Sequence, residues 1–260
     1  PPAAPPAASP SWPVFKPPLP VVQLFPELHP ATPNIVCISS FFPRSLCRDY
    51  VAFLKTLPLQ TTPQRPKRGE AVRLNDRFQI DDAAFARRLW EATGLREVLL
   101  EDDAVKELWQ STDGIIIIIA NLASADKKTY RGGRPMSLNP NIRIYRYSQG
   151  QYFDCHYDGS NNLTLDSVPV KTTWTLLLYL TSAAEGCIGG ETVFYPHDRK
   201  SAAEEIAVSP ETGMLLLHKH GDDCLLVSQL ASRFDCFPHE GRKVQQGEKW
   251  VLRTDLCVRR

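Results

Sequence analysis

The chain has 260 residues, enough to bury a sizeable core, and its 30 basic and 29 acidic residues leave a net charge of +1. This balance gives no reason to expect a nucleic acid or an anionic membrane surface as a partner. The longest apolar run, IIIIIA at residues 115–120, is far shorter than the roughly 20 residues of a membrane-spanning helix. We therefore expect no membrane span in this chain and predict a buried strand at that run.

The first part of the chain is rich in proline. Twelve of the 22 prolines stand in residues 1–33, a composition that favours extended polyproline-like conformation over helix or strand. We predict a proline-rich extended arm over residues 1–34, which is either a functional arm or a flexible remnant of a longer protein.

The compartment stays unknown from the sequence. Because the chain begins at Pro1, the N-terminus is expected to be trimmed, and a signal peptide cannot be assessed. The seven cysteines form no CxxC pair and no even framework, which favours reduced thiols and thereby an intracellular protein.

A strand in IVCISSFF and two amphipathic helices are predicted next. The first helix covers residues 43–57, and the second covers residues 83–94 with Asp81 or Asp82 as its cap and Gly94 as its end. Their apolar stripes indicate packing against a core rather than ligand binding.

From residue 141 the sequence changes to short strand-like runs separated by Gly, Pro, Asp and Ser. These runs are NIRIYRY, WTLLLYLT, GETVFY, EEIAVS, GMLLLHKH and KWVLRTDLCV. No helix-length segments separate them, which argues against a parallel α/β sheet. We predict a mostly β fold with N-terminal helices (α+β), built on a double-stranded β-helix (jelly-roll) barrel.

The predicted elements suggest one domain after the arm. We expect residues 35–260 to form it, with helical support and loops in residues 35–140 and the jelly-roll catalytic core in residues 141–258. The polar segments 61–79 and 121–140 are predicted loops, and either could border a cleft.

The stretch YFDCHYDGS sets His156 and Asp158 two residues apart. On a strand, residues at this spacing project from the same face, while Cys155 and Tyr157 face the other way. Two histidines and one carboxylate form the facial triad that holds non-haem Fe(II). A hydrogen-bonded polar pair at a strand end is the alternative.

A third metal ligand would come from another histidine. The remaining histidines are His29, His197, His218, His220 and His239. The first lies in the arm and the second in a turn, whereas His218 and His220 end a strand and are rivals for the role. Ten residues after His239 stands Lys249, a basic residue that could bind the far carboxylate of a dicarboxylic cosubstrate. This spacing makes His239 the preferred third ligand.

Five segments of residues 141–258 resemble the Fe(II)- and 2-oxoglutarate-dependent dioxygenases, specifically the prolyl 4-hydroxylase-like branch. In chain order they are YRYSQGQYFDCHYDG, WTLLLYLT, GGETVFYP, GMLLLHKH and HEGRKVQQGEKWVLRTDL. RLNDRF at residues 73–78 also looks like the N-terminal part of related fungal and plant sequences. The resemblance implies that His156, Asp158 and His239 bind Fe(2+).

The resemblance also implies how 2-oxoglutarate is bound. Lys249 would grip its far carboxylate, and Tyr147 and Thr192 would help through hydroxyl hydrogen bonds. Arg253 could assist or replace Lys249, since it lies on the same strand face. A barrel-wall tyrosine and a strand threonine are the structural alternatives. The implied cofactors are Fe(2+), 2-oxoglutarate and O2, with ascorbate as the reductant that rescues oxidised iron.

The implied reaction is hydroxylation of a proline residue in a peptide or protein, with release of succinate and CO2. Branch members that act on peptidyl proline tend to carry an arginine just before the WTLLLYLT-type strand and a tryptophan after the lysine. Here the aligned residues are Lys171 or Thr172 and Asp255, although Trp174 and Trp250 lie nearby and could stack on a proline ring.

Two alternatives therefore stay open: the same cofactor chemistry on another side chain or a small molecule, and a catalytically silent jelly-roll domain that binds peptides. The expected partner is a proline-rich peptide or protein. Since the arm is itself such a segment, we hypothesise that it occupies its own or a neighbour's groove. The identity of the substrate and the oligomeric state do not follow from the sequence.

Overall fold

The computed structural model describes residues 9–63, 66, 69–109, 133–196, 204–221 and 236–260. The predicted strand at residues 115–120, most of the predicted loop at residues 121–140, and His197 lie outside the described residues. Within the described part of the chain, no helix combines the length and apolarity that crossing a membrane requires.

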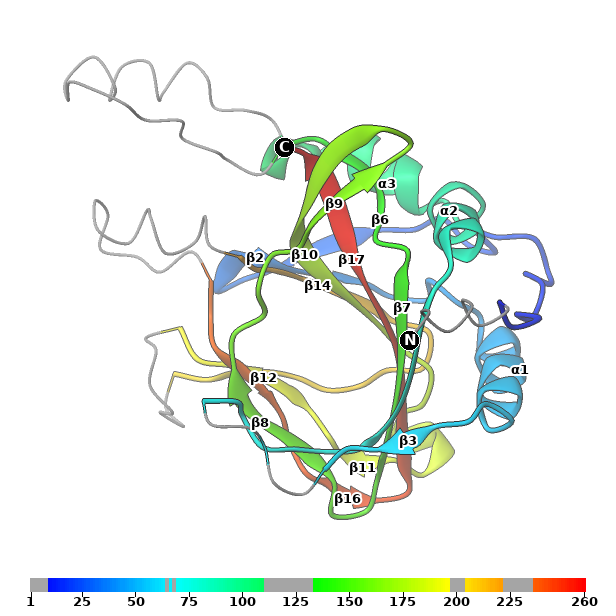
Figure 1. Cartoon of the computed structure of the whole chain (residues 1–260), viewed down its shortest axis with the longest axis vertical. Helices are drawn as coiled ribbons and strands as arrows, with labels where there is room; N and C mark the ends of the chain where they lie inside the picture. Colours follow the sequence, from blue (N-terminus) through cyan, green and yellow to red (C-terminus); the bar gives the residue numbers. More distant parts are fainter. Residues whose placement is uncertain (1–8, 64–65, 67–68, 110–132, 197–203, 222–235) are drawn as a thin grey trace, which may run out of the picture.

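Antiparallel strands make up most of the fold (Figure 1). The large sheet has the order β1 (Pro26–His29), β2 (Thr32–Ile38), β14 (Leu215–Lys219), β10 (Val168–Tyr179), β17 (Glu248–Arg259), β7 (Asn141–Ser148), β5 (Asp76–Asp81) and β3 (Gln60–Thr61), with β6 (Pro135–Leu138) paired to β17 and β9 (Asn162–Leu165) paired to β10. The small sheet has the order β13 (Ile206–Val208), β12 (Thr192–Phe194), β15 (His239–Gly241), β8 (Tyr152–His156) and β4 (Arg73–Leu74). A separate ribbon pairs β11 (Ile188–Gly189) with β16 (Val244–Gln246).

The chain alternates between the two sheets. Strands β7, β10, β14 and β17 lie in the large sheet, and β8, β12, β13 and β15 lie in the small sheet. This alternation is the topology of a double-stranded β-helix, and it confirms the predicted mostly β, jelly-roll fold with N-terminal helices. Among the described residues the two sheets remain separate, so the predicted barrel is a pair of facing sheets.

Three helices cover one side of the large sheet. They are α1 (Arg44–Leu54), α2 (Ala83–Glu91) and α3 (Leu95–Glu101), and short 3-10 turns occur at η1 (Lys106–Leu108) and η2 (Ala183–Glu185). The predicted cap of the second helix is Asp82, whose carboxylate accepts a hydrogen bond from the Phe85 backbone N–H at 2.8 Å. Gly94 does not end that helix directly; with φ +79° it connects α2 to α3, a helix that the sequence analysis did not predict.

Side-chain alternation along β17 separates two cores. Trp250, Leu252 and Leu256 point to the helical side and pack in one apolar cluster with residues of all three helices. Val251 faces the other way, into a second cluster between the sheets that includes Tyr145 and Tyr147. The inward face therefore carries the predicted functional positions, and the outward face anchors the helices.

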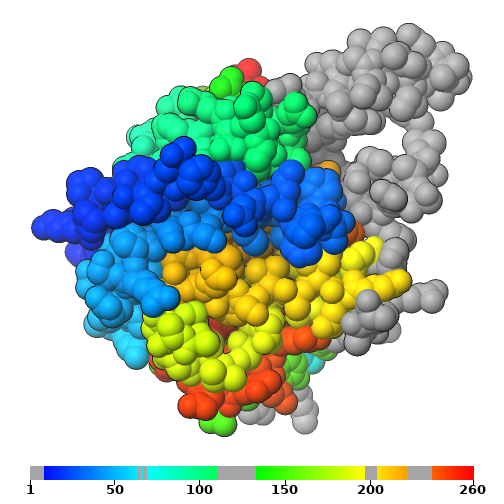
Figure 2. Space-filling view, turned by 180° about the vertical axis from the view of Figure 1, so that it is seen from behind, coloured from blue at the N-terminus to red at the C-terminus, as the bar shows by residue number. Residues whose placement is uncertain are grey.

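The described part of the predicted arm lies on the helical layer. Residues 9–25 contain no helix or strand, and in the view from behind they form a band across the surface beside α2 and α3 (Figure 2). Trp12 is buried, stacks on Phe85 at 4.2 Å between ring centroids, and donates a hydrogen bond from Nε1 to Asp82. The chain enters the large sheet from residue 26 onward, and the division into an arm and one domain stays a prediction.

Two further expectations differ from the structure. The predicted loop at residues 61–79 contains β4 and most of β5. The sequence of β5 is polar and gives no strand signal, because the strand is stabilised by pairing with β7, which lies far along the chain. Among the described cysteines, Cys236 is disulfide-bonded rather than reduced, whereas the other five form no disulfide.

Candidate active site

Neighbouring strands of the small sheet bring two predicted ligands together. β8 ends at His156, β15 begins at His239, and the antiparallel register pairs these two residues directly. Asp158 lies two residues beyond the end of β8 rather than on the strand, but its carboxylate turns toward both rings. Asp158 Oδ1 is 3.7 Å from His156 Nε2, and Oδ2 is 3.7 Å from His239 Nε2.

These three side chains could hold a metal ion. One potential ligand atom from each of His156, Asp158 and His239 lies within 4.8 Å of the others. His156 Nε2 is buried and has no hydrogen-bond partner among the described residues. Two imidazoles and one carboxylate are the donor set that suits non-haem Fe(II), so the residues fit that ion.

The protonation states of the site also suit a metal. The backbone oxygen of Asp154 lies 2.8 Å from His156 Nδ1, which places the proton on Nδ1 and leaves the Nε2 lone pair facing the site. Burial, reinforced by nearby His239, lowers the pKa of His156 to about 3. Burial alone would raise the pKa of Asp158, but Arg253 and the surrounding histidines hold it well below its ordinary value. Neutral imidazole and ionised carboxylate are the forms that bind metals.

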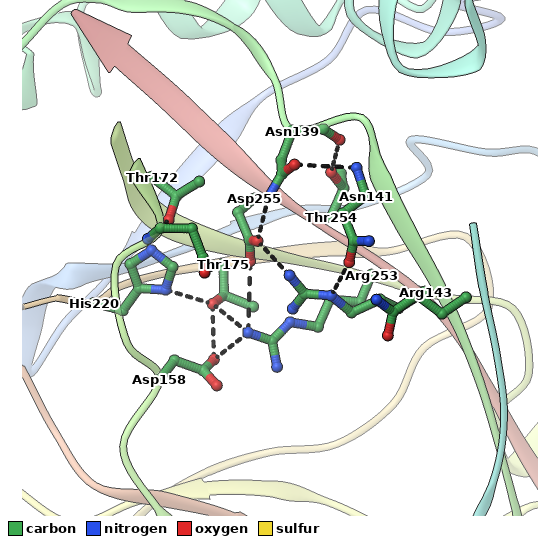
Figure 3. A network of polar contacts seen from close by, with 12 residues as sticks. Asn139, Asn141, Arg143, Asp158, Thr172, Thr175, His220, Arg253, Thr254 and Asp255 are labelled. Carbon is green, nitrogen blue, oxygen red and sulfur yellow. Dashed lines mark hydrogen bonds and ion pairs between the residues drawn. The ribbon is translucent and has the colours of Figure 1, made fainter. Parts of the chain in front are cut away.

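The Asp158 carboxylate is held from behind by two side chains of the large sheet (Figure 3). Thr175 Oγ1 donates to Asp158 Oδ2 at 2.8 Å, and Arg253 Nη2 lies 2.9 Å from the same oxygen. His220 Nδ1 lies 2.9 Å from Thr175 Oγ1 and completes a chain of polar contacts. These contacts fix the orientation of the carboxylate, as outer partners of metal ligands commonly do.

Asp255 anchors this arrangement one step further out. Its side chain is fully buried, and Oδ2 accepts hydrogen bonds from Asn139 at 3.1 Å and Arg143 at 2.9 Å. Its other oxygen is 3.5 Å from Arg253 Nη2. Arg253 therefore lies between two carboxylates, and it also lines the cavity that contains Lys249, so its role as an assistant or alternative to Lys249 stays a prediction.

A narrow cavity of about 40 Å³, here called the inner cavity, lies between the three candidate ligands and Lys249. The Lys249 ammonium is buried and donates to the Gly190 backbone oxygen at 2.6 Å. No carboxylate lies within ion-pair distance of it among the described residues. Since a lone buried ammonium is costly, this wall of the cavity suits an anionic ligand. The inner cavity is too small for a dicarboxylate unless a side chain moves, and the flexible methylene chain of Lys249 is the part of the wall that can move.

The other predicted cosubstrate contacts line the same cavity. Tyr147 is the direct cross-strand neighbour of Lys249, and Thr192 shares a hydrogen bond of 2.7 Å with the hydroxyl of Tyr179. Gly190 adopts φ +75°, and a Cβ there would meet the Lys249 stem at 3.1 Å, so glycine lets the lysine pass. The sequence analysis missed Tyr179, which lies behind the cavity wall and orients the Thr192 hydroxyl.

A wider cavity of about 600 Å³, here called the outer cavity, opens on the opposite side of Asp158. Its polar wall includes Arg73, Arg77, Asn141, Arg143 and Arg253. Both cavities share Asp158, Arg253 and Tyr145, so one of the three candidate metal ligands, Asp158, lies at their junction, whereas His156 and His239 line the inner cavity. No residue of the described part of the predicted arm lines either cavity, so the structure gives no support to the hypothesis that the arm fills the groove.

The other described histidines differ in how close they lie to Asp158. His218 is buried beside the site, with Nε2 3.6 Å from Asp158 Oδ2 and no hydrogen-bond partner within the part of the chain that the structure describes, so it remains a rival ligand. His220 instead contacts Thr175. His29 lies in β1, where its Nδ1 accepts from the Ala31 backbone N–H at 3.2 Å, away from both cavities.

Sequence reasoning missed the supporting residues Thr175, Arg143 and Tyr145 and recognised Asp255 only as a departure from the prolyl branch. The available signal was the alternation of β17, which places Asp255 on the same face as Lys249 and Arg253. The same alternation turns Trp250 into the helical core, where Trp174 also packs, so neither tryptophan reaches the cavities. The suggested stacking on a proline ring is therefore wrong for this arrangement.

Known proteins share the segment that carries these residues. Residues 142–254 match the family model described as the 2OG-Fe(II) oxygenase superfamily. Through this segment, which is less than half of the chain, the protein is similar to the 2OG-Fe(II) oxygenase superfamily. Fe(II), 2-oxoglutarate and O2 are the cofactors that this match implies, and ascorbate is typical of the prolyl hydroxylases within that superfamily.

The chain is similar to prolyl 4-hydroxylase 13 of Arabidopsis thaliana, with 26% identity over 140 residues. The match covers 50% of this chain and 47% of the relative, so it spans about half of that protein's length. The resemblance to the prolyl 4-hydroxylase-like branch is thereby confirmed.

Two solved prolyl hydroxylases are among the similar structures. A prolyl-4-hydroxylase of Pseudomonas putida gives a TM-score of 0.47 at 16% identity, covering 88% of this chain and 95% of that chain. A viral collagen prolyl hydroxylase from Paramecium Bursaria Chlorella virus-1 gives 0.43 at 16% identity, covering 86% of this chain and 96% of that chain.

Proposed function

We propose that this oxygenase is an Fe(II)- and 2-oxoglutarate-dependent dioxygenase that hydroxylates a proline residue in a peptide or protein. The observation that carries the proposal is the convergence of His156, Asp158 and His239, with ligand atoms within 4.8 Å of one another, beside a cavity with a buried lysine. The match of residues 142–254 to the 2OG-Fe(II) oxygenase model supports these cofactors, and the similarity to a plant prolyl 4-hydroxylase supports proline as the target.

Each side chain has a defined task in this proposal. His156, Asp158 and His239 would hold Fe(II), and Thr175 and Arg253 would keep the carboxylate of Asp158 in place. Lys249 would bind the far carboxylate of 2-oxoglutarate, with Tyr147 and Thr192 completing the wall. Bound Fe(II), together with 2-oxoglutarate and O2, supplies the oxidising chemistry that releases succinate and CO2. Ascorbate would keep the iron reduced.

A second candidate keeps the cofactors but changes the substrate. Asp255 occupies the position where prolyl hydroxylases tend to have a tryptophan. Its carboxylate already binds Arg143, Arg253 and Asn139. A polar network of this kind offers no aromatic face to a proline ring. Hydroxylation of another side chain or a small molecule is therefore the alternative that the site favours next.

Succinate release by the purified chain with Fe(II), 2-oxoglutarate and ascorbate tests the cofactor part of the proposal. A proline-rich peptide should raise the rate, and mass spectrometry should find one added oxygen on proline. Succinate release without any response to proline peptides would point to the alternative substrate class. Absence of both turnover and retained iron would contradict the oxygenase proposal and leave a silent peptide-binding domain.

The affinity for 2-oxoglutarate should fall at high pH. Burial lowers the pKa of Lys249 to about 8, although nearby Cys187 and Glu191 raise it by a smaller amount. The charged amine binds the carboxylate, so affinity should be level below pH 8 and should decrease about tenfold per pH unit above it, until the pKa of the bound state is reached.

The measurement is the dissociation constant of 2-oxoglutarate in the presence of Mn(II), taken across this pH range. Lys249→Arg is the matched control, because a guanidinium stays charged and should remove the pH dependence. A wild-type affinity that stays level across pH 8 would show that Lys249 does not bind the carboxylate.

A further inference from the structure

The outer cavity has an unusual excess of positive charge. Four arginines line it, namely Arg73, Arg77, Arg143 and Arg253, while Asp158 is the one carboxylate in its wall within the described part of the chain. Its volume of about 600 Å³ falls within the roughly 300–1,000 Å³ of typical ligand pockets. The cavity therefore has room for a ligand that is larger than a single anionic group.

Two of these arginines are already neutralised. Arg143 forms an ion pair with Asp255 at 2.9 Å, and Arg253 forms one with Asp158 at 2.9 Å. They are direct cross-strand neighbours on β7 and β17 of the large sheet, where Figure 3 shows them side by side, and both line the cavity. Their charges are thus part of the support of the candidate metal site.

The other two arginines have no carboxylate partner among the residues that the structure describes. Arg73 lies flat against Phe153, with its guanidinium carbon 3.7 Å from the ring centroid. Arg77 contacts the amide oxygen of Gln79. Both are half-buried in the cavity wall, and stacking on Phe153 holds the Arg73 fork in place.

The pKa of Tyr145, which lines the same cavity, reflects the electrostatic potential of these arginines. Burial alone would raise the pKa of Tyr145, yet Arg253, Arg73, Arg143 and Arg77 together hold that pKa below its ordinary value. The hydroxyl of a buried tyrosine thus lies in a positive potential that the two carboxylates of the network do not cancel.

We propose that the outer cavity binds a carboxylate of the substrate, an acidic side chain close in sequence to the residue that is oxidised. This inference rests on the proposed function and adds the substrate class to it. Arg73 and Arg77 would receive the carboxylate, because a planar guanidinium fork matches carboxylate geometry. Asp158 lies at the junction of the two cavities, so the reacting group would reach the metal site from this side.

Direct peptide binding tests the inference independently of turnover. The probes are fluorescent peptides with a central proline flanked by glutamate, glutamine or lysine, in the presence of Mn(II) and 2-oxoglutarate without oxygen. The glutamate peptide should bind about tenfold more tightly than the glutamine peptide, as expected for loss of a charge-assisted contact, and added salt should reduce the difference.

Variants locate the contact. Arg73→Gln and Arg77→Gln should each remove most of the preference for glutamate, and Arg77→Glu should shift the preference toward the lysine peptide. The matched control is Arg96→Gln, which alters an exposed arginine on α3 and should leave the preference unchanged. A merely structural role of Arg77 would not transfer the preference to lysine.

The outcomes separate the two proposals. If the wild type turns over 2-oxoglutarate but binds all three peptides equally, the carboxylate inference is wrong while the oxygenase function stands. If it binds glutamate peptides selectively without any turnover, the inference holds and the proposed reaction fails. A competition experiment with N-acetylglutamate tests whether the carboxylate comes from a small acid instead. This source would be supported if N-acetylglutamate displaced the glutamate peptide from the wild type but not from Arg77→Gln.

Discussion

His239→Ala should lose Fe(II) binding and, with it, 2-oxoglutarate turnover. The substitution removes one of three candidate ligands and leaves His156 and Asp158, which cannot complete a facial triad by themselves. Loss of an outer partner of a metal ligand already costs roughly 10- to 100-fold in affinity, so loss of a direct ligand should cost at least about 100-fold. The measurement is metal content and Fe(II) affinity of the purified variant, with circular dichroism to verify folding.

His218→Ala is the informative comparison for this prediction. His218 lies 3.6 Å from the same Asp158 oxygen that faces His239, but it belongs to the large sheet. We expect this variant to retain iron. His29→Ala, which alters a histidine of β1 outside the cavities, should also retain it. Retention of iron in His239→Ala combined with loss in His218→Ala would reverse the assignment of the third ligand.

Asp255→Ala should destabilise the protein strongly. The carboxylate is fully buried and is shared by Arg143 and Arg253, so its removal leaves two largely buried guanidinium groups with too little negative charge. Breaking a buried ion pair by removing one partner costs about 3–5 kcal/mol, and we expect a loss in that range in the free energy of unfolding. Chemical denaturation of the purified variant provides the measurement.

The control for this prediction is Asp166→Ala. Asp166 pairs with Arg87 at 3.5 Å, but its side chain is 87% exposed, and pairs of this kind contribute little to stability. Asp255→Asn keeps the shape and part of the hydrogen bonding, so it should fall between the wild type and Asp255→Ala. Equal midpoints for Asp255→Ala and Asp166→Ala would show that the buried network does not stabilise the fold.

Several elements could be predicted because their signals are local. Asp82 precedes an amphipathic run and caps α2, and the strand alternation of KWVLRTDLCV places Lys249 and Arg253 on one face of β17. The His-x-Asp pair and the lysine ten residues after His239 were likewise visible as spacings along the chain.

Other features depended on contacts that no local pattern encodes. β5 has a polar sequence and was predicted as a loop, because its stability comes from pairing with β7 rather than from its own residues. α3 was missed because Gly94, expected as an end, connects two helices. The sequence analysis placed His156 and Asp158 on one face of a strand. The two side chains do lie close together, but Asp158 follows the end of β8, so strand alternation is not the reason.

The sequence by itself therefore determined the mostly β fold, the main strands after residue 141 and the residue types of a candidate iron site, since these follow from periodicity and spacing. Only the tertiary structure decided which distant residues meet. Antiparallel register sets Thr175 opposite Asp255 and His156 opposite His239, and the β5–β7 pairing carries Arg77 to the outer cavity. Register is fixed by packing across the whole sheet, because a slip of one residue would turn every side chain to the opposite face.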